Sequence, residues 1–260
     1  MRVSVVLCAV MVGLGATAAT AQEPLPPNAF GALGMYPKRL SCADLPVYSP
    51  PVPTYRLTAA HESDAKLRRA YAPPDTLTIP GGTSAGLQTG QQFFVRRLLV
   101  SPNHEQPSAG VPGMVHTAGW LTIIGADSFS ALARIDHACD HFLRDDYHEP
   151  FAAAVMPTTV AAPGAPKFSD MGQLLFGNDG RRSFANGDLI VVNRGSAHGL
   201  TAGARLSVFR DTKRGGPLVP VGHAIVLTVA GDTATVIADR VRDALTAGDW
   251  FGLEGAPTQP

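Results

Sequence analysis

The chain has 260 residues, and its 21 lysine and arginine residues balance 21 aspartate and glutamate residues. Because there is no basic excess or basic run to neutralise phosphates, we expect no nucleic-acid partner. The 27 glycines and 22 prolines, together with sparse helix formers and short apolar runs, favour an all-β protein with many turns.

Residues 1–21 have the pattern of a signal peptide, with a basic Arg2, a short apolar stretch and small residues at the end. A membrane anchor is the alternative, but the apolar stretch is shorter than the ~20 residues that a spanning helix needs. No later segment is apolar enough to span. We expect a mature chain that begins at Gln22, has no transmembrane segment and is exported to the periplasm or the outside of the cell.

The expected mature chain has two cysteines, Cys42 and Cys139. Because an exported chain meets an oxidising environment, these two are candidates for a single disulfide. The alternative is two buried thiols that never meet. In the loop-entropy description the bridge would contribute about 3 to 5 kcal/mol.

Residues 22–77 form the expected N-terminal arm, which is rich in proline. Proline fixes φ and removes a backbone donor, so most of the arm should be extended or irregular. Residues 61–71 are an exception, because charged and apolar side chains alternate there with a helical period and Pro73 follows. This pattern predicts a short helix over 61–71.

Two stretches of the chain repeat one β unit. Three glycines, one leucine and one arginine recur at a constant offset of 113 positions. The first copy has Gly82, Gly86, Leu87, Gly90 and Arg97, and the second has Gly195, Gly199, Leu200, Gly203 and Arg210. Each copy continues through strand-like runs with a turn between them. We expect a first small β-barrel unit, SH3-like or related, over 78–151, a Pro/Ala linker over 152–167 and a second barrel unit over 168–255.

Residues 82–86 read Gly-Thr-Ser-Ala-Gly, the pattern with which serine hydrolases present a nucleophile. The second copy has Ala197 in place of Ser84, although the glycines recur. A turn explains both copies, because glycine permits a positive φ. The glycines interpreted as structural turn residues are Gly86, Gly90, Gly199 and Gly203.

His137, Cys139 and His141 are the densest group of metal-ligand types. Alternate residues of a strand share a face, and His-Cys-His is a reasonable zinc set. The alternative, which we favour, is that Cys139 is oxidised and the histidines lie at a strand edge, because the second copy has no matching ligands. We therefore expect no metal and no cofactor.

Charged residues also recur at equivalent positions of the two copies. We expect Arg97 to pair with Asp146, and Arg210 with Asp249, across the mouth of each barrel; solvated strand-end charges are the alternative. The run GNDGRR at 177–182 is typical of a turn, because Asn and Asp precede a glycine.

The second copy resembles a known module. Its Gly199-Leu200-x-x-Gly203 strand, the run Val-Gly-His-Ala-Ile-Val at 221–226 and the closing Ala-Gly-Asp-Trp at 247–250 are similar to the C-terminal β-barrel of flagellar assembly protein T. They also resemble modules of other exported bacterial proteins, some of which contain LysM motifs. The resemblance implies a small β-barrel in the cell envelope, and it implies no functional residues, because these motifs belong to the fold.

The leading hypothesis is a non-catalytic, exported binding or assembly module of the cell envelope, with an envelope protein or a cell-wall component as partner. One alternative is a serine hydrolase that uses Ser84 with His116 or His137. Another is a zinc-binding domain around His137, Cys139 and His141. The sequence predicts no oligomeric state.

Overall fold

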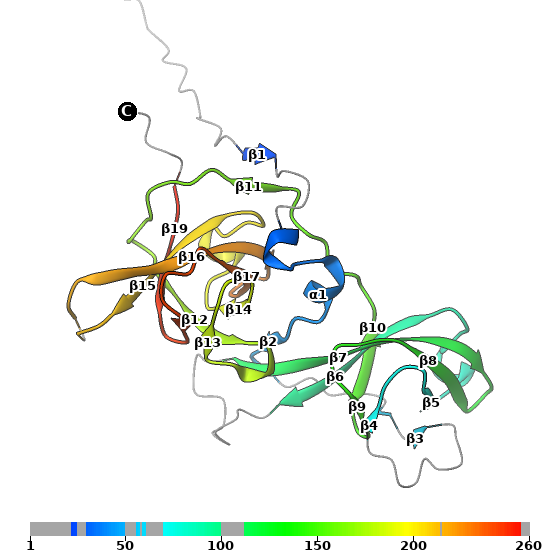
Figure 1. Cartoon of the computed structure of the whole chain (residues 1–260). Helices are drawn as coiled ribbons and strands as arrows, with labels where there is room; N and C mark the ends of the chain where they lie inside the picture. The colour runs from blue at the N-terminus through cyan, green and yellow to red at the C-terminus, as the bar shows by residue number, and fades with distance from the viewer. Residues whose placement is uncertain are drawn as a thin grey trace, which may run out of the picture.

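The computed structural model describes residues 22–24, 30–49, 56–57, 59–60, 70–99, 112–213 and 215–255. Within these ranges the regular structure is β-strand apart from one α-helix, α1 (Pro37–Ser41), and short 3-10 turns, which confirms the all-β prediction. Figure 1 shows two β units with α1 between them. No helix of the described ranges is long and apolar enough to cross a membrane.

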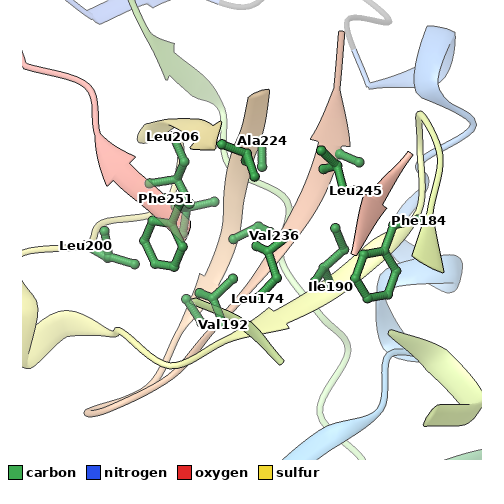
Figure 2. Packing of buried hydrophobic residues seen from close by; sticks show 14 of the residues in the cluster. Leu174, Phe184, Ile190, Val192, Leu200, Leu206, Ala224, Val236, Leu245 and Phe251 are labelled. Carbon is green, nitrogen blue, oxygen red and sulfur yellow. The ribbon is translucent and has the colours of Figure 1, made fainter. Parts of the chain in front are cut away.

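The second unit is a closed barrel (Figure 1). Its strands, in the order in which they are hydrogen-bonded, are β12 (Gly172–Gly177), β14 (Leu189–Val192), β17 (Ala234–Asp239), β16 (Leu218–Val229), β15 (Arg205–Asp211) and β19 (Trp250–Leu253). A ribbon of β13 (Ser183–Phe184) and β18 (Leu245–Thr246) adds Phe184 and Leu245 to the core. Figure 2 shows this core, in which Leu206, Val236 and Phe251 meet inside the barrel.

The first unit has the same succession of strands but is a half-barrel, an open sheet of seven strands. Along the sheet the strands are β10 (Tyr147–Pro150), β6 (Gln92–Leu99), β7 (Gly113–Ala126), β8 (Ser130–Ala138), β5 (Thr76–Pro80) and β3 (Ala59–Ala60), and β2 (Leu45–Val47) pairs with the start of β7. An isolated bridge between Arg56 and Tyr147 joins the two ends. It stands where Gln173 pairs with Trp250 in the closed barrel.

The repeat extends into the segment expected to be the arm. The pairing of β4 (Ala70–Tyr71) with β9 (Phe142–Leu143) in the first unit matches that of β13 with β18 in the second. The helix predicted over 61–71 is therefore wrong at Ala70 and Tyr71, because the repeated unit needs a strand there, and 61–69 lie outside the described residues.

The arm and the linker lie against the second barrel. The strand β1 (Gln22–Pro24) pairs with β11 (Thr159–Ala161) of the linker. The outer face of the barrel and these segments form a second apolar cluster, which contains Phe30, Met35, Leu40, Ala43, Val160, Leu189, Ile225, Leu227 and Ile237. The part of the expected arm that precedes β2, residues 22–24 and 30–44, thus packs against the second barrel and is tied to the first unit by the bond between Cys42 and Cys139, and it is only in part extended. The name arm is kept below for this part.

The residues 82–86 and 195–199 form equivalent 3-10 turns, η3 (Thr83–Ala85) and η5 (Ser196–His198). Positive φ angles of 83°, 92°, 77° and 85° occur at Gly86, Gly90, Gly199 and Gly203. A side chain at Gly195 would meet the backbone oxygen of Ala230 at 2.2 Å. This close approach explains why glycine opens the turn in both copies.

Candidate functional site

A pocket of about 800 Å³ lies where the arm and the two units meet, and we call it the junction pocket. Its walls come from three separate parts of the chain. They include Tyr36, Lys38, Arg39 and Cys42 of the arm, His116, His137 and Cys139 of the first unit, and Asn178 and Asp179 of the second. Side chains from all three parts therefore converge on this one cavity.

The helix α1 is held in place at both ends. Pro37 occupies the first helical turn, where its missing N–H is not needed. At the other end Cys42 forms a disulfide with Cys139, with their Cα atoms 5.7 Å apart. The bridge joins residues separated by 97 positions and fixes the arm to the end of β8. Because the disulfide uses both cysteines of the expected mature chain, that chain has no free thiol.

His137 lies on one wall of the junction pocket and stacks against Trp120, with ring centroids 4.4 Å apart. Desolvation and the nearby charge of Lys38 lower the pKa of His137 below its usual value. The neutral form of this imidazole is therefore favoured. It presents an aromatic face and a neutral donor or acceptor to a bound group.

A second wall holds a buried histidine among three carboxylates. The Nδ1 atom of His116 lies 2.9 Å from Oδ1 of Asp44 and 3.4 Å from Oδ1 of Asp179, and its Nε2 atom lies 3.3 Å from Oδ2 of Asp140. Burial lowers the pKa of His116, but its hydrogen bond with Asp44 and the charges of Asp44 and Asp179 outweigh burial. The net pKa of His116 lies above its usual value.

Asp44 connects the arm to the second unit. Its carboxylate is 1% exposed and accepts a hydrogen bond of 2.7 Å from the backbone N–H of Asp179. Its own N–H donates to the amide oxygen of Asn178 at 3.3 Å, and that amide nitrogen donates to the carbonyl of Cys42 at 3.4 Å. The turn that presents Asn178 and Asp179, η4 (Asn178–Gly180), reaches this position because Asp179 adopts a left-handed φ of 59°.

The zinc ligands considered from the sequence are not brought together as a set. Cys139 is part of the disulfide, and the side chain of His141 is 68% exposed beside Asp140. Around Cys139 the group that does assemble is Cys42, Cys139 and His137. With the disulfide formed, this group offers no thiolate to a metal ion.

Ser84 lies far from the histidines considered as its partners. It is exposed on η3, and its backbone N–H donates to Ser128 at the tip of the β7–β8 hairpin. His137 is at the other end of β8, seven residues beyond Ser130, or about 23 Å along the strand. His116 and His137 both line the junction pocket instead.

The two arginine–aspartate pairs are present in both units. Arg97 donates to Asp146 through Nε and Nη2 at 2.7 and 3.0 Å, and Arg210 donates to Asp249 at 2.9 and 2.8 Å. Burial raises the pKa of Asp146 despite the hydrogen bonds from Arg97. Because the same pairs occur in both barrels, they are parts of the fold.

Sequence reasoning missed Asp44 and Asp179 as partners of His116. Asp44 is two residues from Cys42, so the disulfide prediction already implied that it lies near the first unit. Asp179 is in the run expected to be a turn, and nothing local indicates what the turn faces. His116 is 72 residues and Asp179 is 135 residues from Asp44 along the chain. No short sequence motif can indicate a contact over such separations.

No model of a known protein family matches the chain, and no curated protein matches it. The resemblance of the second unit to the barrel of flagellar assembly protein T therefore stays an expectation from the sequence.

Proposed function

We propose that the protein is a non-catalytic, exported binding or assembly module of the cell envelope, and that it binds its partner in the junction pocket. The observation that supports this is the construction of the pocket from three parts of the chain, tied together by a disulfide and by buried polar contacts. A cavity that is already formed binds without a large ordering cost.

The lining of the junction pocket suits a partner segment with apolar and acidic side chains. The ring of Tyr36 is 59% exposed at the rim, and His137 offers a second aromatic face. Lys38 and Arg39 add positive charge on the arm side, whereas Asp179 adds a negative charge on the side of the second unit. A segment of an envelope protein or of a cell-wall peptide has the required chemistry.

Photo-crosslinking in the native host tests the proposal. A photoreactive phenylalanine replaces Tyr36, and the matched control places it at Phe168, which is also 59% exposed but is outside the lining of the junction pocket. We expect the probe at Tyr36 to capture one envelope component that the probe at Phe168 does not capture. The same crosslinks from both positions would contradict binding in the pocket.

The purified component then provides a quantitative check. We expect Tyr36→Ala to weaken its binding about tenfold or more, because tyrosine is enriched among the interface residues whose truncation costs about 2 kcal/mol or more. Phe168→Ala should leave the affinity unchanged. Mass spectrometry of the protein from the cell envelope fraction tests the expected export, since the mature chain should begin at Gln22.

A further inference from the structure

Asp44, His116 and Asp179 come from the arm, the first unit and the second unit, and their ligand atoms all lie within 4.8 Å of one another. We propose that these three residues, the junction triad, bind a divalent transition-metal ion, with Zn²⁺ as the best fit, and that the ion fastens the arm to both units. This goes beyond the proposed binding function and does not depend on which partner enters the junction pocket.

The spacing of the ligand atoms fits a small metal ion. Zinc binds imidazole nitrogen and carboxylate oxygen at about 2.0–2.2 Å in tetrahedral geometry, so neighbouring ligand atoms around it lie about 3.3–3.6 Å apart. Nδ1 of His116 lies 2.9 Å from Oδ1 of Asp44 and 3.4 Å from Oδ1 of Asp179. The ion would take the place of the proton on Nδ1, and Oδ1 of Asp44 would move back from its hydrogen-bonding distance by about 0.4–0.7 Å to reach the tetrahedral spacing.

The surroundings of the junction triad are those of a metal ligand set. A ligating histidine usually directs its other ring nitrogen at a carboxylate, and Nε2 of His116 faces Oδ2 of Asp140 at 3.3 Å. His116 is 5% exposed, yet Nε2 has no hydrogen bond of good geometry. Asp44 is oriented through its Oδ2 atom, which accepts the backbone N–H of Asp179, so that Oδ1 faces the imidazole.

The charge balance also calls for a cation. Three carboxylates, of Asp44, Asp140 and Asp179, surround one imidazole. Arg97 lies 3.5 Å from Asp140, but its Nε and Nη2 atoms are already bound to Asp146. Of these carboxylates only that of Asp44 is buried, since Asp140 and Asp179 are 44% and 64% exposed. A buried carboxylate is costly without a positive partner, and the cations near Asp44 are Arg96 and, when protonated, His116. A proton on His116 supplies one charge, whereas a zinc ion supplies two.

The second unit shows that the barrel itself does not require this histidine. His116 is opposite Arg97 in the sheet, and the residue opposite Arg210 is Val219. The pairing of Arg210 with Asp243 matches that of Arg97 with Asp140. The first unit therefore keeps the repeated ion pair and adds a histidine, which is met by aspartates from the two other parts of the molecule.

The remaining coordination positions face the junction pocket, because His116 and Asp179 both line it. Three protein ligands are the number found in zinc sites that keep an open position for water or a ligand oxygen. Mixed imidazole and carboxylate ligands favour zinc over calcium, which prefers an all-oxygen shell of six to eight ligands.

The test is calorimetric titration of ZnCl₂ into the tag-free mature protein, dialysed against EDTA and then buffer, with the disulfide intact. We expect one zinc ion per chain, a higher Tm with zinc, and much weaker binding of CaCl₂. Asp179→Asn should lower the zinc affinity about tenfold or more and abolish the Tm shift. Its side chain is 64% exposed, so this variant should fold normally and tests the site without changing the buried His116.

Two control variants separate the junction triad from other sources of zinc binding. Asp243→Asn removes an aspartate of similar exposure, 68%, and should leave the affinity unchanged. His137→Ala should also leave it unchanged, and Co²⁺ in place of zinc should show no thiolate-to-metal charge-transfer band. No zinc uptake, equal uptake by Asp179→Asn, or loss of uptake in His137→Ala would each overturn the proposal.

Discussion

Asp249 provides the sharpest test of how the second barrel is stabilised. Its carboxylate is 4% exposed and accepts two hydrogen bonds from Arg210, at 2.9 and 2.8 Å, and one from the N–H of Thr246 at 2.8 Å. Removing one partner of a buried ion pair typically costs about 3–5 kcal/mol. Here the N–H of Thr246 loses its acceptor and Arg210 loses two hydrogen bonds, although Arg210 is 24% exposed and keeps its contacts with Asp243 and the carbonyl of Ala244. We expect Asp249→Ala to lower the free energy of unfolding by about that amount.

At the usual 2–4 °C per kcal/mol for a protein of this size, the Tm should fall by about 6–20 °C. The two tryptophans are Trp120 in the first unit and Trp250 in the second. In a Trp120→Phe background, urea unfolding followed by the fluorescence of Trp250 reports on the second barrel alone.

Asp243→Ala is the matched control, since it removes an aspartate that also pairs with Arg210, at 2.8 Å, but is 68% exposed. An exposed ion pair contributes at most about 1 kcal/mol. If Asp249→Ala destabilises the barrel no more than Asp243→Ala does, then neither the burial of Asp249 nor its hydrogen bond from Thr246 stabilises the barrel, and the reasoning is refuted.

Further predictions concern the disulfide, a turn, an acid-sensitive contact and Ser84. Replacing Cys42 and Cys139 by serine should lower the free energy of unfolding by about 4–5 kcal/mol in the loop-entropy model, because the disulfide joins residues 97 positions apart. Urea unfolding measures this loss, and a loss under about 1 kcal/mol would contradict stabilisation by the disulfide. Gly199→Ala should cost about 1–2 kcal/mol from its φ of 77° alone, since no atom lies within 4 Å of the added Cβ, and a neutral result in the same assay would exclude strain at this turn. Burial raises the pKa of Glu254, but hydrogen bonds from His223, Gly164 and Ser207 outweigh burial, so the pKa is lowered. The stability that this carboxylate contributes is present above the unfolded pKa and is lost as the pH falls below about 4.5. Glu254→Gln should therefore remove this part of the fall in Tm between pH 6 and pH 3. A fluorophosphonate probe should leave the protein unlabelled, and labelling that Ser84→Ala abolishes would establish the hydrolase instead.

The repeat was the part of the fold that the sequence predicted best. Glycines in tight turns are required by local geometry, so they recur at a constant offset of 113 positions. The two arginine–aspartate pairs also recur, although the paired residues are 49 and 39 positions apart and the aspartates are offset by 103. Closure of the barrel was harder to predict, because it depends on strand pairing at the ends. In the first unit that closure is reduced to the bridge between Arg56 and Tyr147.

The arm and the junction triad could not be predicted from patterns. The periodicity of 61–71 suggested a helix, but tertiary pairing with β9 makes Ala70 and Tyr71 a strand. Tertiary context commonly overrides local preference in such short segments. Asp44 and Asp179 carry no local signal, because their role depends on contacts across 72 and 135 residues.

The long reach of the arm has a kinetic consequence. Its anchoring contacts, the disulfide to Cys139 and the hydrogen bond from Asp179 to Asp44, close loops of 97 and 135 residues. The hairpins of each unit close far shorter loops and pay less chain entropy before their contacts form. We therefore expect the segment at the start of the chain to dock last, after both units have folded, so that the junction pocket exists only in the finished molecule.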